Sequence, residues 1–242
     1  MSDFGQDVAG IGTLADPVRR ELYLYVCAQP AAVGRDEAAE AVGVPHHRAK
    51  FHLDRLEAEG LLETDYARLT GRSGPGAGRP AKLYRRADRD IAVSLPEREY
   101  ELAGRIMADA ISTSIRTGGS VGEALESAAA AHGRALGATV AGDVSDTDDA
   151  LAIATRVLAE HGYEPRIESV GTAERVIMAN CPFHSLAHSH TALVCDMNHA
   201  LLTGLTDAIA PARLCASLEP GEGRCCVVLT AAGAAGAKAR QR

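Results

Sequence analysis

The sequence predicts an α+β protein with an N-terminal winged helix-turn-helix, a long linking helix and a C-terminal α+β domain. Residues 16–86 contain three helical patterns and then two strands around a Gly/Pro-rich loop. Residues 94–161 continue as alanine-rich helices, and beyond residue 165 the apolar period changes to that of strands. We therefore expect a DNA-binding domain at 1–90, a linking and dimerisation helix at 91–118, a Cys-rich sensor domain at 119–230 and a disordered tail at 231–242.

The N-terminal helices have recognisable ends. Asp16 is a favourable cap for the first helix, and Pro17 fits its first turn. We expect Asp36 to cap the second helix, which stops at Gly43. A third helix over residues 45–59 and strands at 61–67 and 82–86 complete the order typical of a winged helix.

The C-terminal half predicts helices and then two hairpins. A helix is expected to start at Ser94 and Pro96 and to end at Thr117, before Gly118. The other expected elements are helices at 121–140, 150–161 and 190–209, and strand pairs at 166–170 with 175–179 and at 213–218 with 225–230.

The basic residues are concentrated near the N-terminus. The chain has a formal net charge of −7, which argues against a protein that coats nucleic acid without sequence specificity. Between Tyr66 and Arg89, however, seven basic residues face a single acidic one, a local balance of +6. Such a localised positive segment favours binding to the phosphate backbone of DNA.

The third helix has the side chains of a recognition helix. Its N-terminal residues are the ones that would reach base edges in the major groove. Base contacts are expected from His46, His47, Lys50 and Phe51, and phosphate contacts from Arg48, Arg55, Arg72, Arg79 and Lys82.

Residues 16–86 also resemble bacterial winged-helix repressors of the ArsR-like kind. The resemblance lies in PHHRAKFHLDRLEAEGLL and in GRPAKLYR, the start of the returning strand. It implies a homodimer on a two-fold-related operator of double-stranded DNA. The helix at 94–117 is our candidate for the dimer contact.

The cysteines are concentrated near the C-terminus. No secretory leader and no membrane-spanning run is visible, so we expect a cytoplasmic protein whose thiols stay reduced. Five of the six cysteines fall within residues 181–226, among several histidines. Clustered thiols in a reducing compartment indicate metal binding or redox chemistry rather than disulfides.

The cysteine spacing favours an iron–sulfur cluster over a structural zinc ion. The paired C-x₂₋₄-C knuckles of zinc sites are absent, whereas thiolates from distant elements suit cluster iron. Cys181 is expected at a strand end and Cys195 on a helix. Cys225 and Cys226 are expected to start a strand, where alternation would turn only one of them towards the site, with a slight preference for Cys226. Cys215 is a weaker candidate, and Cys27 is expected to be a buried small hydrophobe.

The segments NCPFHSLAHSHTALVCDMN and GRCCVVL resemble the SufR family of iron–sulfur repressors. This resemblance implies a dimeric repressor of the operon for cluster assembly (suf), active when it holds a cluster. It implies three cysteine ligands, at Cys181, Cys195 and one of Cys225 and Cys226. It leaves open whether the cluster is [2Fe–2S] or [4Fe–4S], and whether a fourth ligand or an open iron site completes it. The candidates for a fourth ligand are His184, His190 and Asp196.

Two other kinds of repressor and one enzyme class compete with this interpretation. An ArsR-like sensor of zinc or another metal is the nearest, because Cys181 and His184 form half of a zinc motif. A metal-free thiol redox sensor is the next. A metalloenzyme fused to a DNA-binding module is disfavoured, because the sequence has no phosphate-binding Gly loop, H-E-x-x-H or nucleophile elbow. We therefore predict a regulator and not an enzyme.

Overall fold

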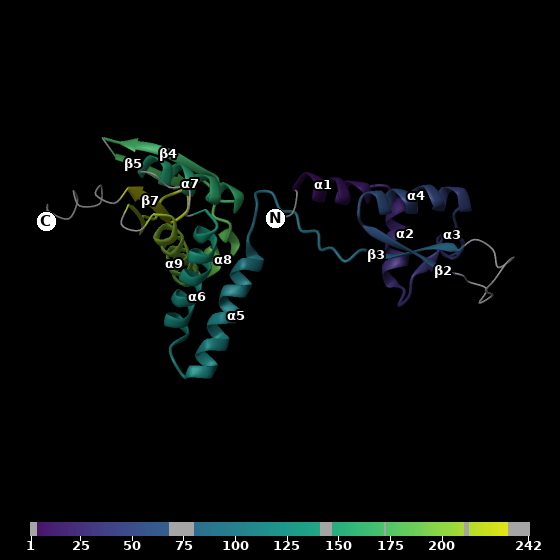
Figure 1. The fold of residues 1–242 in the computed structure, drawn as a ribbon, viewed down its shortest axis with the longest axis horizontal. Helices are drawn as coiled ribbons and strands as arrows, with labels where there is room; N and C mark the ends of the chain where they lie inside the picture. The colour runs from purple at the N-terminus through teal and green to yellow at the C-terminus, as the bar shows by residue number, and fades with distance from the viewer. Residues whose placement is uncertain (1–3, 68–79, 141–146, 172, 211–212, 232–242) are drawn as a thin grey trace. The chain divides into compact units, whose positions relative to one another are not determined.

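A computed structural model describes residues 4–67, 80–140, 147–171, 173–210 and 213–231. It divides the chain into two compact units, Met1–Val93 and Ser94–Arg242. The fold is α+β, as the sequence predicts: the first unit contains the helix-turn-helix, and the second combines helices with a separate sheet (Figure 1).

The first unit is a winged helix. Its elements are α1 (Phe4–Thr13), α2 (Pro17–Ala28), β1 (Val33–Gly34), α3 (Arg35–Val42), α4 (His46–Ala58), β2 (Leu62–Ala67) and β3 (Ala81–Arg86). The strands form an antiparallel sheet in the order β1-β3-β2, in which Leu62 pairs with Arg86 and Ala67 with Ala81. The helix α1 and the short strand β1 were not predicted from the sequence.

Local capping explains most helix ends in this unit. Asp16 Oδ1 accepts the backbone N–H of Arg19 at 2.9 Å, as its cap position requires. Gly43 adopts φ +72°, a left-handed conformation that only glycine takes readily, and it ends α3. The prediction that Asp36 caps α3 is wrong. Gly34 occupies the cap, its N–H is accepted by Glu37 at 3.4 Å, and Asp36 lies in the first turn.

The core of the first unit fixes the orientation of α4. Ala49, Leu53 and Leu56 lie on one face of this helix and are fully buried, together with Leu22 and Tyr84. The opposite face of α4 is therefore left to solvent, which is where a recognition helix needs its polar side chains.

The second unit packs helices against a four-stranded sheet. Its elements are α5 (Tyr100–Thr117), α6 (Val121–Ala138), α7 (Thr147–Glu160), β4 (Pro165–Val170), β5 (Ala173–Met178), α8 (His184–Ser189), α9 (Thr191–Ile209), β6 (Leu214–Leu218) and β7 (Val227–Ala231). The antiparallel strand order is β4-β5-β7-β6. Both α7 and α9 contact the sheet, and α6 packs along α9.

The packing of α6 on α9 depends on glycine. A Cβ added at Gly133 would lie 1.8 Å from Leu201 O, and one at Gly204 would lie 2.1 Å from Ala130 O. The two helices therefore approach backbone to backbone, which leaves no room for a side chain at either position.

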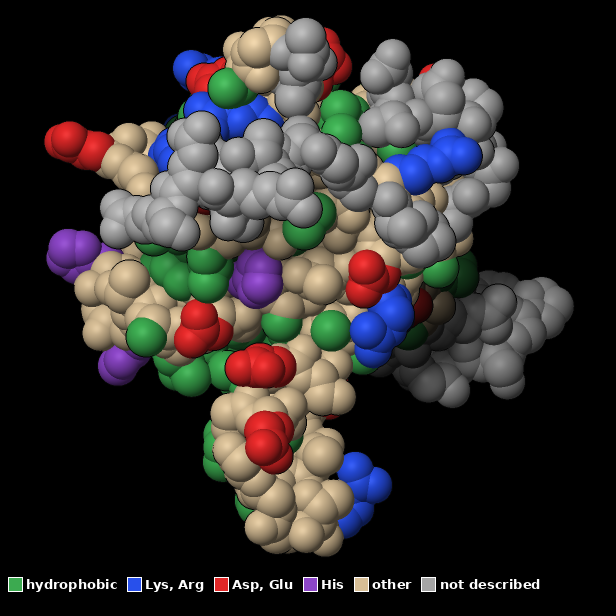
Figure 2. Space-filling view, turned by 90° about the vertical axis from the view of Figure 1, so that its left-hand side faces the viewer, with side chains coloured by type: hydrophobic (Ala, Val, Ile, Leu, Met, Phe, Trp, Pro, Cys, Tyr) green, Lys and Arg blue, Asp and Glu red, His purple; other side chains and the backbone are tan. Residues whose placement is uncertain are grey.

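The α5–α6 hairpin projects away from the sheet (Figure 1), and hydrophobic side chains lie along one edge of the projection (Figure 2). Ile111, Ile115 and Val121 are all exposed, Ile115 to 79%. The helix that the sequence predicts as the dimer contact therefore presents apolar surface to solvent.

Three sequence predictions for this unit need correction. The predicted helix start at Ser94 is wrong, because α5 begins at Tyr100 and the preceding residues hydrogen-bond to another loop. The short helix α8 was not predicted and precedes α9. The last strand begins at Val227, so Cys225 and Cys226 precede it rather than start it.

The predicted tail lies outside the described residues, except for Ala231. None of the helices in the described part of the chain is long and apolar enough to cross a bilayer.

Candidate cysteine site and nucleic-acid interface

Three segments of the second unit bring four cysteines together. Cys181 lies in the turn between β5 and α8, Cys195 lies in α9, and Cys225 and Cys226 directly precede β7. The Cys225 thiol is in hydrogen-bonding contact with the thiols of Cys181 and Cys226, and Cys226 is in the same contact with Cys195. The four thiols therefore form one continuous chain of contacts.

The backbone holds these segments in place. Cys225 N donates to Met178 O at 2.9 Å, which ties the approach to β7 to the end of β5. His184 N donates to Cys181 O at 3.0 Å and closes the turn that carries Cys181. Glu219 N donates to Cys226 O at 2.7 Å across the β6–β7 connection. These three hydrogen bonds tie the segments that carry Cys181, Cys225 and Cys226 to neighbouring parts of the second unit.

Both Cys225 and Cys226 belong to the chain of thiol contacts. Because Cys225 and Cys226 precede the strand, the alternation of strand side chains does not apply to them, and the argument that only one can face the site fails. Cys225 is 1% exposed and belongs to the core, whereas Cys181, Cys195 and Cys226 are half-buried. The sequence preference for Cys226 over Cys225 finds no support in this geometry.

Three of the four thiols have a pKa raised above the ordinary value. The hydrogen bond with Cys225, together with burial, raises the pKa of Cys181 above its ordinary value. The hydrogen bond with Cys181 lowers the pKa of Cys225, but contact with Cys226 and burial outweigh it and raise that pKa to about 11. Burial also raises the pKa of Cys195, against an opposing hydrogen bond with Cys226. A thiol with a raised pKa loses its proton when a cation binds to the sulfur in the proton's place.

A buried polar pair supports Cys225. Asn198 Nδ2 donates to Cys225 Sγ at 3.2 Å, and Asn198 Oδ1 accepts the hydroxyl of Tyr163 at 2.6 Å. Burial, followed by the nearby Cys225, raises the pKa of Tyr163 well above its ordinary value, so the hydroxyl remains a donor. Sequence reasoning missed both supporting residues, although Asn198 ends the NCPF…DMN segment.

The predicted fourth ligands lie on the surface. His184, His190 and Asp196 are exposed, and in the described residues none of them hydrogen-bonds to a cysteine thiol. Asp196 lies beside Cys195 on α9, where its charge contributes to the raised pKa of that thiol. The role of all three as ligands stays a prediction.

The described residues contain no group of three or more His, Cys, Asp or Glu side chains with the geometry to hold a single metal ion. A zinc ion needs its sulfur ligands about 2.3 Å from one point, whereas the thiolates of an iron–sulfur cluster bind different iron atoms.

The remaining two cysteines lie elsewhere. Cys215 is exposed on β6, and its thiol donates weakly to Ala216 O at 3.5 Å. Cys27, in the first unit, is half-buried against the core there and contacts Tyr23 and Arg86. Neither thiol joins the group of four.

The polar face of α4 is exposed as the sequence predicts. The exposed side chains are those of His46, His47, Arg48, Lys50, Phe51 and Arg55. Phe51 is 65% exposed, so its ring is accessible to a partner. Two of these residues already have partners: His46 hydrogen-bonds to Asp36 at 2.8 Å, and Arg55 forms an ion pair with Glu59 at 2.5 Å.

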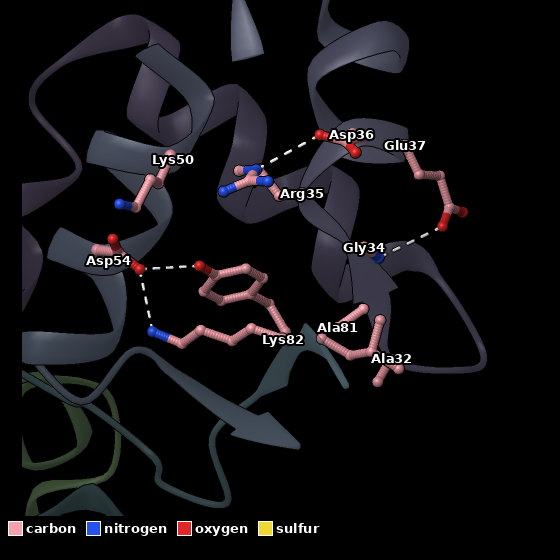
Figure 3. Close-up of a pocket in the computed structure, with 11 residues that line it drawn as sticks. Ala32, Gly34, Arg35, Asp36, Glu37, Lys50, Asp54, Ala81 and Lys82 are labelled. Atoms are coloured by element: carbon pink, nitrogen blue, oxygen red, sulfur yellow. Dashed lines mark hydrogen bonds and ion pairs between the residues drawn. The ribbon is translucent and has the colours of Figure 1, made fainter. Parts of the chain in front are cut away.

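Lys82 is held within its own unit. It forms an ion pair with Asp54 at 3.0 Å (Figure 3). It also pairs with Glu57, and Tyr84 donates to the same Asp54 oxygen at 2.8 Å. Partial burial lowers the pKa of Lys82, but the two carboxylates outweigh this and raise it. Lys82 thus anchors the sheet to α4, and its contact with DNA stays a prediction. Arg72 and Arg79 lie outside the described residues.

Comparison with known families identifies the first unit. A helix-turn-helix domain family matches residues 14–65, from the residues before α2 into β2. The match supports a DNA-binding transcriptional regulator of the winged-helix type and favours a regulator over an enzyme. No curated protein and no solved structure matches the chain.

Proposed function

We propose that this protein is a transcriptional repressor whose DNA binding depends on an iron–sulfur cluster held in its second unit. The observation that carries the proposal is the single chain of contacts among Cys181, Cys195, Cys225 and Cys226 in a protein with a helix-turn-helix domain. Thiols drawn from three separate segments are the donor set that clusters use.

The residues present fit such a group. All four donors are sulfur, the softest ligand available to a protein. Cys225 belongs to the buried core, and Cys181 and Cys226 pack against it. Cys181, Cys195, Cys225 and Cys226 would hold the cluster, and Asn198 would donate to one of the sulfurs. When bound, a cluster would link the three segments. Oxidants or iron shortage would remove the cluster and with it this link.

The regulated gene follows from the sequence resemblance. The SufR-like segments at 180–198 and 223–229 contain all four clustered cysteines. We infer that the target is the operon for cluster assembly and that the repressor binds it as a homodimer. The exposed Ile111 and Ile115 on α5 are the apolar surface on which a second copy would pack.

The direct test is anaerobic purification followed by an absorption spectrum and counts of iron and acid-labile sulfide. We expect a brown protein that loses its colour when Cys181 or Cys195 is changed to Ser. Separate Cys225→Ser and Cys226→Ser variants show whether both members of this pair bind the cluster or only one. Cys215→Ser is the matched control, because that thiol is exposed and outside the group. A colourless wild type that contains zinc would favour the metal-sensing alternative.

A thiol redox sensor is the second candidate, and one observation favours it. The contacts of Cys181 with Cys225 and of Cys195 with Cys226 place two thiol pairs in reach of disulfide formation. An iron-free protein whose DNA binding changes reversibly with oxidant would establish this alternative.

A further inference from the structure

The segment that enters the second unit is bonded to the turn that carries Cys181. Residues 87–99 form neither helix nor strand. Near the end of this segment, Arg98 Nη1 donates to Asn180 Oδ1 at 2.6 Å and to Cys181 O at 2.7 Å. Asn180 Nδ2 donates in return to Glu97 O at 3.2 Å. One guanidinium nitrogen thus joins the segment to a candidate ligand residue.

Further bonds tighten the same junction. Glu99 N donates to Pro182 O at 3.2 Å, and the Glu99 carboxylate pairs with His161 Nδ1 at 3.1 Å. Asn180 Nδ2 also donates to Gly162 O at 2.5 Å. The backbone groups of residues 97 and 99 are therefore engaged with the 180–182 turn and do not extend α5 towards Ser94.

Arg98 differs from the other groups at this junction. Asn180 is buried and belongs to the turn itself, whereas Arg98 belongs to the segment that follows the first unit, which ends at Val93. Of the described side chains in residues 87–99, it alone hydrogen-bonds to residues 180–182. Arg98 is therefore the side chain of this segment that bonds directly to the backbone of Cys181.

We propose that Arg98 is the positioning residue through which occupancy of the cysteine site sets the conformation of the connecting segment, and with it DNA affinity. This inference rests on the proposed function. With the cysteines bound to a common ligand, the Cys181 turn is fixed, and Arg98 and Glu97 are held on it. With the ligand lost, the turn relaxes and the segment has no regular structure of its own to hold it.

The experiment compares full-length wild type, Arg98→Met, Arg98→Lys and Arg105→Met. Arg105→Met is the matched control, because Arg105 lies on α5, is exposed, and bonds to Glu101 one turn away. Each protein is measured without metal and after anaerobic loading with ferrous iron and sulfide. The quantity measured is the ratio of the two dissociation constants, at fixed salt, for a duplex that wild type selects from a random pool.

We expect a wild-type ratio of roughly 5- to 150-fold, the usual range for coupled sites. Arg105→Met keeps this ratio. Arg98→Met takes it towards one at unchanged iron content and visible spectrum, and Arg98→Lys, which retains the charge and a donor, restores part of it. If Arg98→Met does not fold, Arg98→Lys is compared with Arg105→Met instead. The ratio of dissociation constants should then be smaller in Arg98→Lys than in Arg105→Met.

Each other outcome overturns the inference at an identifiable step. A wild-type ratio in the Arg98 variants refutes the coupling role alone and leaves the proposed function standing. Loss of iron from Arg98→Met would assign Arg98 to cluster retention instead of coupling. A wild type that holds no cluster, or whose affinity ignores it, refutes the inference and the proposed function together.

Discussion

Asn198 donates a hydrogen bond of 3.2 Å to the sulfur of Cys225, in a part of the second unit where both residues are 1% exposed. Tyr163 orients this amide through a second hydrogen bond of 2.6 Å. Buried donors to sulfur are expensive to leave unpaired and stabilise negative charge on the sulfur. The pair therefore belongs to the chemistry of the cysteine site as well as to the core.

Replacing Asn198 with Leu should lower the reduction potential of the loaded site. Without the amide donor, the extra negative charge of the reduced state is less well stabilised. Tyr163→Phe, which keeps the ring and loses the orienting hydroxyl, should produce a smaller shift in the same direction. Spectroelectrochemical titration measures both values, and an unchanged or raised potential in Asn198→Leu would refute the role of this hydrogen bond.

Two residues of α4 should affect DNA binding in different ways. We expect Arg48 to contact a phosphate, so in Arg48→Ala binding should weaken for all sequences and the slope of log K against log salt should fall by about 0.9. We expect Phe51 to make an apolar base contact, so in Phe51→Ala the preference at one base position should relax while the salt slope stays. Binding titrations at several salt concentrations separate the two effects, and a changed slope in Phe51→Ala would contradict this assignment.

His52 should make the first unit sensitive to acid. Burial lowers the pKa of this imidazole below its ordinary 6.5, and Arg19 Nε donates to its Nδ1 at 3.3 Å. As the pH falls through about 6.5, the unfolded chain binds a proton that the native state resists, so the free energy of unfolding decreases.

His52→Gln keeps an acceptor for Arg19 and does not titrate. Its loss of stability between about pH 7.5 and about pH 5.5 should be smaller than that of wild type. Urea unfolding at the two pH values measures this. His47→Gln, on the exposed face of the same helix, is the control, and an equal acid response in His52→Gln and wild type would count against the assignment.

Two glycine substitutions should have opposite effects on the second unit. Gly133→Ala places a methyl group against the α9 backbone and should cost about 3 kcal/mol or more in the free energy of unfolding. Gly104→Ala, on exposed α5 with nothing within 4 Å, should stabilise by about 0.5–1 kcal/mol. Urea denaturation measures the free energy of unfolding of both variants. An unchanged value in Gly133→Ala would contradict the close approach of α6 and α9.

Elements that depend on local sequence were predictable. The start of α2 at Asp16 and Pro17 and the ends of α3 and α5 at Gly43 and Gly118 require only neighbouring residues, and the structure places them there. The start of α5 was wrong, because the backbone of Glu97 and Glu99 bonds to a turn more than eighty residues away in the chain. Neighbouring residues in the sequence do not reveal a hydrogen bond to so distant a turn.

The cysteine site was also predictable only in part. The concentration of cysteines near the C-terminus indicated Cys181, Cys195 and the Cys225–Cys226 pair, and the structure brings all of them into contact. The exclusion of one member of the pair depended on where β7 begins, and a two-residue difference in that boundary removed its basis. The support from Asn198 depends on contacts between distant segments, which spacing along the chain does not encode.

The measurement that tests the account most directly is the DNA affinity of one wild-type preparation before and after cluster removal by a chelator, at constant salt. Cys195→Ser, treated identically, controls for effects of the treatment. The account predicts tight binding by the iron-loaded protein, weaker binding by the stripped protein, and weak binding by Cys195→Ser throughout. Equal affinity of the loaded and stripped protein would contradict it.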